Sequence, residues 1–392
     1  MKQLLEKISL LSLSFMLVST FAVSPALPKM IEYYQGLGYT AGQVSFLFSV
    51  PSFAVIGVLL LTPFISKFLS QHQTIILGLL LLSVGGSIPV LTRSYHLVFV
   101  GRIFLGIGIG LINAHAINII SERYSGKEKI KMLGMRASTE VLGSASLTFF
   151  VGQLMVQSWS QAYLVYSIGF FILLLYLLFV PPLKKKHQKE DQLEKKSLSF
   201  KQILYIIAMS TYAGLVILIN SVITLRIPQV VSQLDFGTST DSSLVLSSMM
   251  LMGIFAGMIF NKLQELLKNY LLPIVLVILG TGLALLWQSN SIWDLTLGAM
   301  ITGFTYCLGV IRVFQVISER IPRNQLITAT TLVLLGCNLG GGISAIVDQL
   351  LGQFSEQPGA TFSYFAFLSI GLGMILLICH FLTNPIHKSR QG

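Results

Sequence analysis

The stretch LVFVGRIFLGIGIGLINAHAINIISER, residues 97–123, decides the fold class of this chain. Residues 97–120 form a continuous, mostly apolar run, and at about 1.5 Å per residue such a helix is about 36 Å long, enough to cross a bilayer. The run ends at the charged sequence Ser121-Glu122-Arg123. It therefore predicts a membrane-spanning helix.

The end of this stretch is repeated later in the chain. Ile120-Ser121-Glu122-Arg123 recurs as Ile317-Ser318-Glu319-Arg320, 197 residues on, close to half of the 392-residue chain. Further residues fall into register at the same offset: Gly101 and Gly106 with Gly298 and Gly303, Asn118 with Gln315, and Gly143 with Gly340. Since parallel repeats are a known plan of transporters, two halves of similar fold are predicted.

Eleven other apolar runs accompany the first. Charged residues make up 10% of the chain, against about 25% in a usual soluble domain, which excludes a soluble globule. The runs predict an all-α integral membrane protein with twelve transmembrane helices in two pseudo-symmetric six-helix bundles. The predicted spans are 8–28, 44–65, 74–92, 97–120, 132–154, 162–182, 202–226, 243–261, 270–288, 294–317, 326–351 and 361–382.

A basic loop divides these spans six and six. It runs from Pro181-Pro182-Leu183-Lys184-Lys185-Lys186 to Lys201, and predicts an N-terminal bundle 1–182, a linker 183–201 and a C-terminal bundle 202–392. The first run follows a lysine-bearing start, as a signal peptide does, but no clear cleavage site follows it, so we predict a retained span.

Basic residues predict the orientation in the membrane. Twelve spans put both tails on one side, and twenty of the 26 Lys and Arg residues fall there. By the positive-inside rule, both termini are expected to be cytoplasmic, in a multi-pass protein of the cytoplasmic membrane. Topology thereby accounts for the net charge of +11, and a nucleic-acid partner is not expected.

Enzyme and cofactor motifs are missing from the sequence. It has no P-loop, HExxH or GxSxG, and its three cysteines show neither CxxC spacing nor pairing with histidine. We therefore expect a protein that is not an enzyme, with no cofactor and no metal site.

The fourth run carries an arginine, Arg102, followed by Gly106, Gly108 and Gly110. An arginine in lipid costs about 2.5–3.5 kcal/mol on the insertion scale, so it should face protein or water and have a partner. The glycines let a neighbouring helix approach closely. Asn113, eleven residues on, returns to nearly the same face. An arginine that only ties helices together is the alternative to a functional one.

With these residues the chain resembles the transporters of the major facilitator superfamily, and is most similar to its twelve-span drug and metabolite exporters. The resemblance covers essentially the whole chain and rests on the two halves, on Ala26-Leu27-Pro28, and on Arg102 with its glycines. It implies alternating access around a central cavity, an arginine that assists proton coupling, and a monomer.

Three features depart from that pattern. The loop after the second span usually carries an Asp-Arg-x-Gly-Arg cluster, whereas residues 63–72 have no aspartate and one lysine. The fifth span lacks the Gly-Pro element of many proton-driven exporters, and the first span has no acidic residue.

The fifth span offers Arg136 and Glu140 instead, four residues apart and so on one helical face. Opposite charges at this spacing partly neutralise each other, which lowers the cost of placing them in a membrane. Asp294 and Asp348 fall near the outer ends of their spans, so Glu140 is the one acid expected deep in the hydrocarbon. We predict that Glu140 is the proton-coupling acid, assisted by Arg136 and Arg102; a static Arg136–Glu140 pair is the alternative.

Candidate substrate or gate residues lie in the fourth, tenth and eleventh spans. His115 and Arg312 occupy equivalent repeat positions, in spans that face each other across the cavity in the superfamily, and would hold an anionic group or form an inner gate. Asn113 and Asn338 add amides, the latter inside a glycine cluster at 336–342. Helix capping and packing are the alternatives. Three methionines of the eighth span suit a soft pocket or plain packing: Met249, Met250 and Met252.

The expected function is secondary active transport, in the form of proton-coupled efflux of a small amphipathic compound or drug by alternating access. The main alternative is a proton-coupled uptake permease for a small organic anion, because three intramembrane arginines against one deep acid give a positive interior. A non-transporting membrane receptor on the same fold is the third possibility. The expected partners are the small-molecule substrate, protons and the lipid bilayer.

Overall fold

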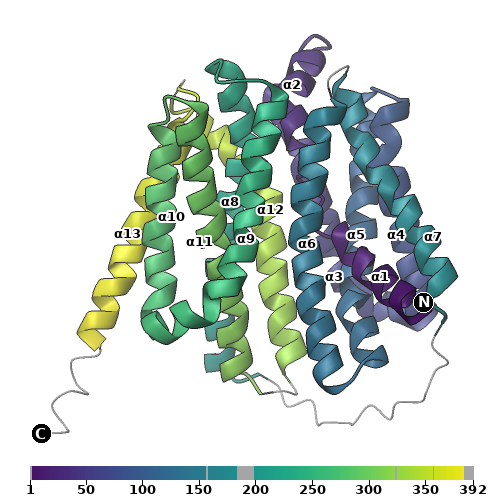
Figure 1. The fold of residues 1–392 in the computed structure, drawn as a ribbon. Coiled ribbons are helices and arrows are strands. Elements are labelled where there is room, and N and C mark those ends of the chain that lie inside the picture. The colour runs from purple at the N-terminus through teal and green to yellow at the C-terminus, as the bar shows by residue number, and fades with distance from the viewer. Residues whose placement is uncertain (1, 156–157, 183–197, 323–324, 356, 384–392) are drawn as a thin grey trace, which may run out of the picture.

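The structure, a computed structural model, describes residues 2–155, 158–182, 198–322, 325–355 and 357–383. These residues form helices and no strand, and the long helices stand side by side (Figure 1). The described chain starts and ends toward the lower end in Figure 1, here called the terminal face, and the other end is the opposite face. The helices are α1 (Lys2–Phe15), α2 (Leu27–Gln35), α3 (Ala41–Phe68), α4 (Gln71–Leu91), α5 (Tyr95–Arg123), α6 (Gly126–Leu154), α7 (Ile168–Phe179), α8 (Phe200–Gln233), α9 (Ser239–Leu267), α10 (Leu271–Trp287), α11 (Ile292–Arg320), α12 (Leu326–Gly352) and α13 (Ala360–Thr383).

Nine stretches of the described chain are long and apolar enough to span a membrane, and one of them, Ser239–Trp287, contains both α9 and α10. Two crossings lie outside that set. The first span is split into α1 and α2, each too short by itself, and α6 carries several charged residues in its first three turns. The all-α membrane fold with twelve crossings in two bundles is thus confirmed. Most of the predicted linker, residues 183–197, lies outside the described residues.

The first span is broken, which corrects the prediction of a continuous helix over 8–28. α1 ends at Phe15, irregular turns follow, and a short 3-10 helix, Ser24–Ala26, leads into α2. Pro25 and Pro28 prevent a regular helix across the last part of this break, because they have no N–H to donate to the carbonyls of Phe21 and Ser24 one turn earlier. Both prolines instead occupy the first positions of the new helices, which proline favours.

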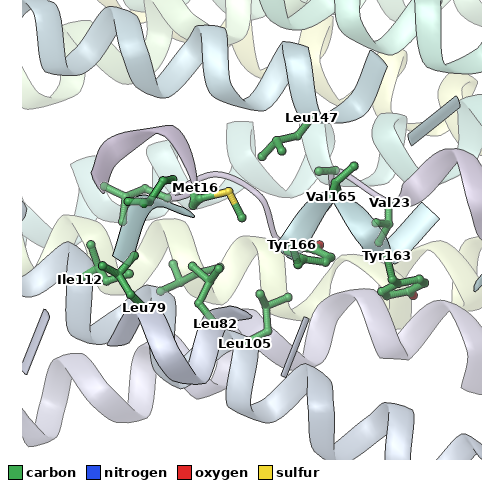
Figure 2. Packing of buried hydrophobic residues seen from close by; sticks show 14 of the residues in the cluster. Met16, Val23, Leu79, Leu82, Leu105, Ile112, Leu147, Tyr163, Val165 and Tyr166 are labelled. Atoms are coloured by element: carbon green, nitrogen blue, oxygen red, sulfur yellow. The ribbon is translucent and has the colours of Figure 1, made fainter. Parts of the chain in front are cut away.

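The two halves pack largely within themselves. The largest cluster of buried apolar side chains comes almost wholly from residues 10–180, and three further clusters come from residues 206–366. Figure 2 shows the core of the first half, where side chains of α4, α5, α6 and the 3-10 helix Trp159–Ser167 lie around Met16 and Val23 of the broken span. The halves meet mainly along two helix pairs, α6 with α9 and α3 with α12.

The sequence repeat occupies equivalent places in the two halves. Arg123, at the end of α5, donates from Nη1 to Oε1 of Glu6 in α1 at 2.6 Å. Arg320, at the end of α11, lies with its guanidinium carbon 4.7 Å from the ring centroid of Tyr205 in α8. Each arginine therefore ties the fourth helix of its half to the first, although the chemistry of the contact differs.

Candidate functional site: a central cavity

A cavity of about 750 Å³ lies between the two halves. One face of α6 between Gly134 and Ser144 contributes from the first half, together with Val18 of the broken span. The second half contributes one face of α9 between Met249 and Met258, one face of α11 between Gly303 and Phe314, and Asn220 of α8. Most of the lining side chains are apolar. A cavity of this size is within the range that holds drug-sized ligands.

The cavity reaches the middle of the bundle. Glu140, Gly253 and Tyr306 all line it, and they are the midpoints of α6, α9 and α11. Transporter substrates commonly bind near the bilayer midplane, at the interface of two repeats. Depth and position therefore both mark this cavity as the candidate binding site.

The cavity is closed toward the opposite face along α6 and α9. Thr240 Oγ1 donates to Gly152 O at 3.0 Å, and Ser247 Oγ donates to Ala145 O at 3.0 Å. The cavity's own end is marked by Ser144 of α6, whose Oγ lies 3.1 Å from Sδ of Met250. Hydrogen bonds between membrane helices average only about 0.6 kcal/mol, so such a seam holds the halves together without locking them.

The second helix pair, α3 with α12, is closed in the same way. Ser49 Oγ lies 3.3 Å from Ser344 Oγ and accepts from Ala345 N at 3.3 Å. Toward the terminal face, a Cβ built on Gly57 of α3 or on Gly257 of α9 meets no atom of the described residues within 4 Å. Among the described residues, the two halves are therefore joined at the opposite face, and the cavity opens toward the terminal face.

Cys307 provides a test of this opening. It is half-buried in α11 and lines the cavity, whereas Cys337 of α12 is buried. With Cys337 and Cys379 replaced by alanine, we expect a membrane-impermeant thiol reagent to label Cys307 at least tenfold faster from the terminal face than from the opposite face. Equal rates from both faces in oriented vesicles would contradict this opening, and Cys307→Ser supplies the blank.

Glu140 is the one residue with a formal charge among the described residues that line the cavity. Its Oε2 lies 3.2 Å from Nη2 of Arg136, one turn away on α6, and 28% of the Glu140 side chain is exposed. Arg136 itself is not part of the lining, and its buried Nε has no hydrogen-bond partner among the described residues. The structure thus brings the predicted pair together and turns the acid, rather than the base, toward the cavity.

The lining contains residues that sequence reasoning missed. Tyr306 and Asn220 add polar groups opposite α6, and Met258 joins Met249 and Met250 in an apolar, polarisable wall. Of the three predicted methionines, Met252 is not part of the lining. The missed residues sit in apolar runs without any charge or motif, so only the packing of the two halves distinguishes them from lipid-facing or core residues.

Arg102 lies elsewhere. It is completely buried in α5 and makes no ion pair with a described acid. Its Nε donates to Leu47 O at 2.8 Å, its Nη2 to Thr20 O at 2.5 Å, and its Nη1 to the hydroxyl of Tyr166 at 3.2 Å. The structure therefore does not bring Arg102 together with Glu140.

The four candidate substrate or gate residues are also outside the lining. Arg312 is buried in α11, where its Nη1 donates to Oε1 of Gln315 at 3.0 Å and lies 3.6 Å from Oε2 of Glu319. His115 has a buried Nε2 without a partner among the described residues, and Asn113 is half-buried. Asn338 Nδ2 donates to Leu334 O of its own helix at 2.9 Å. Their functional roles stay predictions.

One buried ion pair was not expected from the sequence. Asp348 of α12 accepts from Nε of Arg226 in α8 at 2.9 Å, and the same arginine donates from Nη2 to Thr361 Oγ1 at 2.9 Å. The pair lies toward the opposite face and away from the cavity, and it joins three helices of the second half. Arg226 and Asp348 are 122 positions apart in the chain, so no local sequence pattern could predict this ion pair.

Comparison with known proteins agrees with this architecture. A sequence profile of the Major Facilitator Superfamily matches residues 9–345. An uncharacterized transporter of Bacillus subtilis (strain 168), YycB, is 26% identical over 185 residues, a match that spans 45% of this chain and 44% of that protein. The chain thus spans less than half the length of this relative.

Solved structures show the same fold at low identity. The nucleoside transporter NupG superposes with a TM-score of 0.71 at 13% identity, over 97% of this chain and all of that one. A peptide transporter, POT, gives a TM-score of 0.72 at 13% identity, over 96% and 94% of the two chains. A bacterial homolog of the human lysosomal transporter Spinster, in an inward-facing and unoccupied conformation, gives 0.69 at 12% identity over 95% of each chain.

Proposed function

The chain belongs to the Major Facilitator Superfamily and is a transporter rather than an enzyme, and we propose that it exports a small amphipathic compound in exchange for protons by alternating access. The observation that carries the proposal is the position of Glu140, the one formally charged residue lining a mid-bundle cavity of about 750 Å³ among the described residues. An apolar wall with one carboxylate suits a ligand that is largely apolar and carries a polar or cationic end.

The direction of transport follows from the orientation that we propose. Basic residues concentrate at the terminal face. If the protein lies in the cytoplasmic membrane, as we propose, the positive-inside rule places this face in the cytoplasm. The cavity opens at that face, so it would load from the cytoplasm. Release on the other side would complete export by a single polypeptide.

Competition at Glu140 would couple the two fluxes. Protonation from the outside removes the negative charge and weakens the contact with Arg136, 3.2 Å away. Substrate that enters from the cytoplasm binds best when the Glu140 carboxylate is charged, and its binding therefore favours loss of the proton from Glu140. Because proton and substrate prefer different packings of the two halves, each shifts the equilibrium between the inward-open and outward-open states.

The second state would close α6 against α9 at the terminal face. From the contact of Ser144 with Met250, two helical turns toward that face lead to Ala137 on α6 and Gly257 on α9. Both residues are small, line the cavity and are exposed, and Gly257 has no neighbour within 4 Å of a built Cβ. A seven-residue step keeps facing residues aligned when two helices wrap around each other. We therefore expect Ala137 and Gly257 to meet in the outward-open state.

The alternative function, uptake of an organic anion, has less support once the positions of the arginines are known. It rested on three intramembrane arginines, but Arg102 bonds to carbonyls and a tyrosine, Arg136 pairs with Glu140, and Arg312 contacts Gln315 and Glu319. None of the three lines the cavity. A receptor role on the same fold is left as an outcome of the experiment that follows.

Reconstituted liposomes with a pH-sensitive dye inside would test the proposal. Proton gradients of either sign are imposed, and lipophilic cations, antibiotics and organic acids are added in pools. Proton flux opposite to substrate flux is the expected result. Flux in the same direction would establish uptake instead, and binding without flux would establish the receptor role.

A further inference from the structure

A buried cation without an acid stands out in the first half. Arg102 is fully buried, yet no described carboxylate lies within ion-pair distance. Its guanidinium carbon lies 5.2 Å from the ring centroid of Phe48, and the rest of its contacts are hydrogen bonds to oxygen atoms. Intramembrane charges are expensive and usually pair with opposite charges or with backbone carbonyls, so these oxygen atoms are what holds Arg102 in the membrane.

Two of these oxygens are carbonyls that regular helices would have satisfied themselves. Thr20 lies in the broken part of the first span, where helical hydrogen bonds end. Leu47 lies in α3 four residues before Pro51, which has no N–H to bond to Leu47 O. Non-helical backbone at membrane depth requires partners from the protein. Arg102 supplies both, from Nη2 to Thr20 O at 2.5 Å and from Nε to Leu47 O at 2.8 Å.

Tyr166 extends the same arrangement. Its hydroxyl accepts from Nη1 of Arg102 at 3.2 Å and donates to Ser19 O at 2.7 Å. Figure 2 shows Tyr166 within the core that surrounds the broken span, between Val165 and Leu105. Arg102 thus reaches two consecutive carbonyls of the break, one directly and one through a fully buried tyrosine.

The segment that Arg102 holds also forms part of the cavity wall. Val18, next to Ser19, lines the cavity, and Val18 O accepts from Ser144 Oγ of α6 at 3.4 Å. On the same helix, a Cβ on Gly143 would overlap the carbonyl of Phe15, so α6 and the end of α1 are in close contact. Ser144 lies one turn from Glu140. The position of the broken segment therefore fixes the wall beside the only charged lining residue that the structure describes.

We propose that Arg102 is a positioning residue, a tethered cation that holds the broken first span in place as a wall of the transport cavity. The link between Arg102 and transport rests on the proposed function. The tether between Arg102 and the broken span does not depend on it. The tether assigns Arg102 a role other than the proton coupling that the family resemblance implies. The guanidinium is needed for its hydrogen-bond donors, since a point charge in the same place would leave the carbonyls of Thr20 and Leu47 without directed partners.

The experiment compares Arg102→Ala and Arg102→Lys with wild type, by melting temperature in detergent and by transport in liposomes. We expect both variants to melt several degrees lower and Arg102→Ala to transport at least tenfold more slowly. Ethylguanidinium should restore melting temperature and rate in Arg102→Ala, because it refills the site with N–H donors. Tetramethylammonium has the same charge but no N–H donor and should restore neither. Arg226→Ala, which removes a buried arginine outside the cavity, should gain from neither cation.

The pH profile of transport separates positioning from proton coupling. A positioning role predicts that Arg102→Lys lowers the rate without moving the midpoint of the profile. A shifted midpoint with an unchanged melting temperature would overturn the proposal, as would rescue by tetramethylammonium. If no substrate is found and the proposed function fails, the melting experiment still decides the tether: loss in Arg102→Ala without recovery by ethylguanidinium would refute it.

Discussion

Glu140→Gln is expected to abolish proton-coupled transport while the protein stays folded in the membrane. The amide has almost the same shape as the carboxyl group but neither takes up nor releases a proton at any accessible pH. It also removes the ion pair with Arg136, whose Nη2 lies 3.2 Å from Glu140 Oε2. Substrate-driven proton flux in dye-loaded liposomes should fall at least a hundredfold, to the level of empty vesicles.

Exchange of labelled for unlabelled substrate across the same liposomes supplies the second measurement. Exchange does not need net proton movement, so Glu140→Gln should retain it for a substrate with a neutral polar end. A cationic substrate should exchange more slowly, because the amide lacks the negative charge. The matched control is Glu128→Gln, which removes an exposed ion pair with Lys7 at the terminal face, outside the cavity, and should leave coupling at the wild-type level. Wild-type coupling in Glu140→Gln would remove Glu140 from the mechanism.

A disulfide between Ala137→Cys and Gly257→Cys is expected to stop transport almost completely. In the present state these positions face open space across the cavity mouth, so cross-linking should be slow. In the outward-open state they should meet, and a disulfide needs Cα atoms within about 4.4–6.8 Å. A substrate or pH condition that favours that state should therefore speed cross-linking, measured by gel shift in a protein without native cysteines.

A second cysteine pair provides the reciprocal control. Ala145→Cys and Ser247→Cys lie at the closed seam, where Ser247 Oγ donates to Ala145 O at 3.0 Å, and should cross-link readily in the present state. Conditions that speed one pair should slow the other, and reducing agent should restore transport in both. Simultaneous rapid cross-linking of both pairs would contradict rocking of the halves about the cavity.

The sequence contains prolines that indicate a break in the first span, but a continuous span was predicted. Pro25 and Pro28 were visible in the sequence, and two prolines three residues apart remove two helical donors in one turn. Prolines inside helices do not always break them, however: α3 contains Pro51 and Pro63 and continues to Phe68. The sequence alone does not show where a carbonyl freed by a proline finds its partner: Arg102 donates to Leu47 O from another helix.

Some contacts of the charged residues could be predicted from the sequence, and others could not. Arg136 and Glu140 are four apart on one helix, so their pairing followed from helical geometry alone. The pair of Arg226 with Asp348 joins residues 122 positions apart, and Arg102 contacts three segments that lie up to 82 positions from it in the chain. No spacing rule relates such residues, because their distance depends on how helices from different parts of the chain pack.

By itself the sequence determined the membrane fold, the two repeated halves and the acid at the middle of the fifth span. These features follow from the length and polarity of each apolar run, because each helix must by itself be long and apolar enough to cross the bilayer. Only the tertiary structure decided which face of the cavity is open, that Glu140 rather than any arginine lines it, and that Arg102 serves the broken span. These depend on which helix faces are brought together, and van der Waals packing and buried hydrogen bonds between distant segments settle that choice.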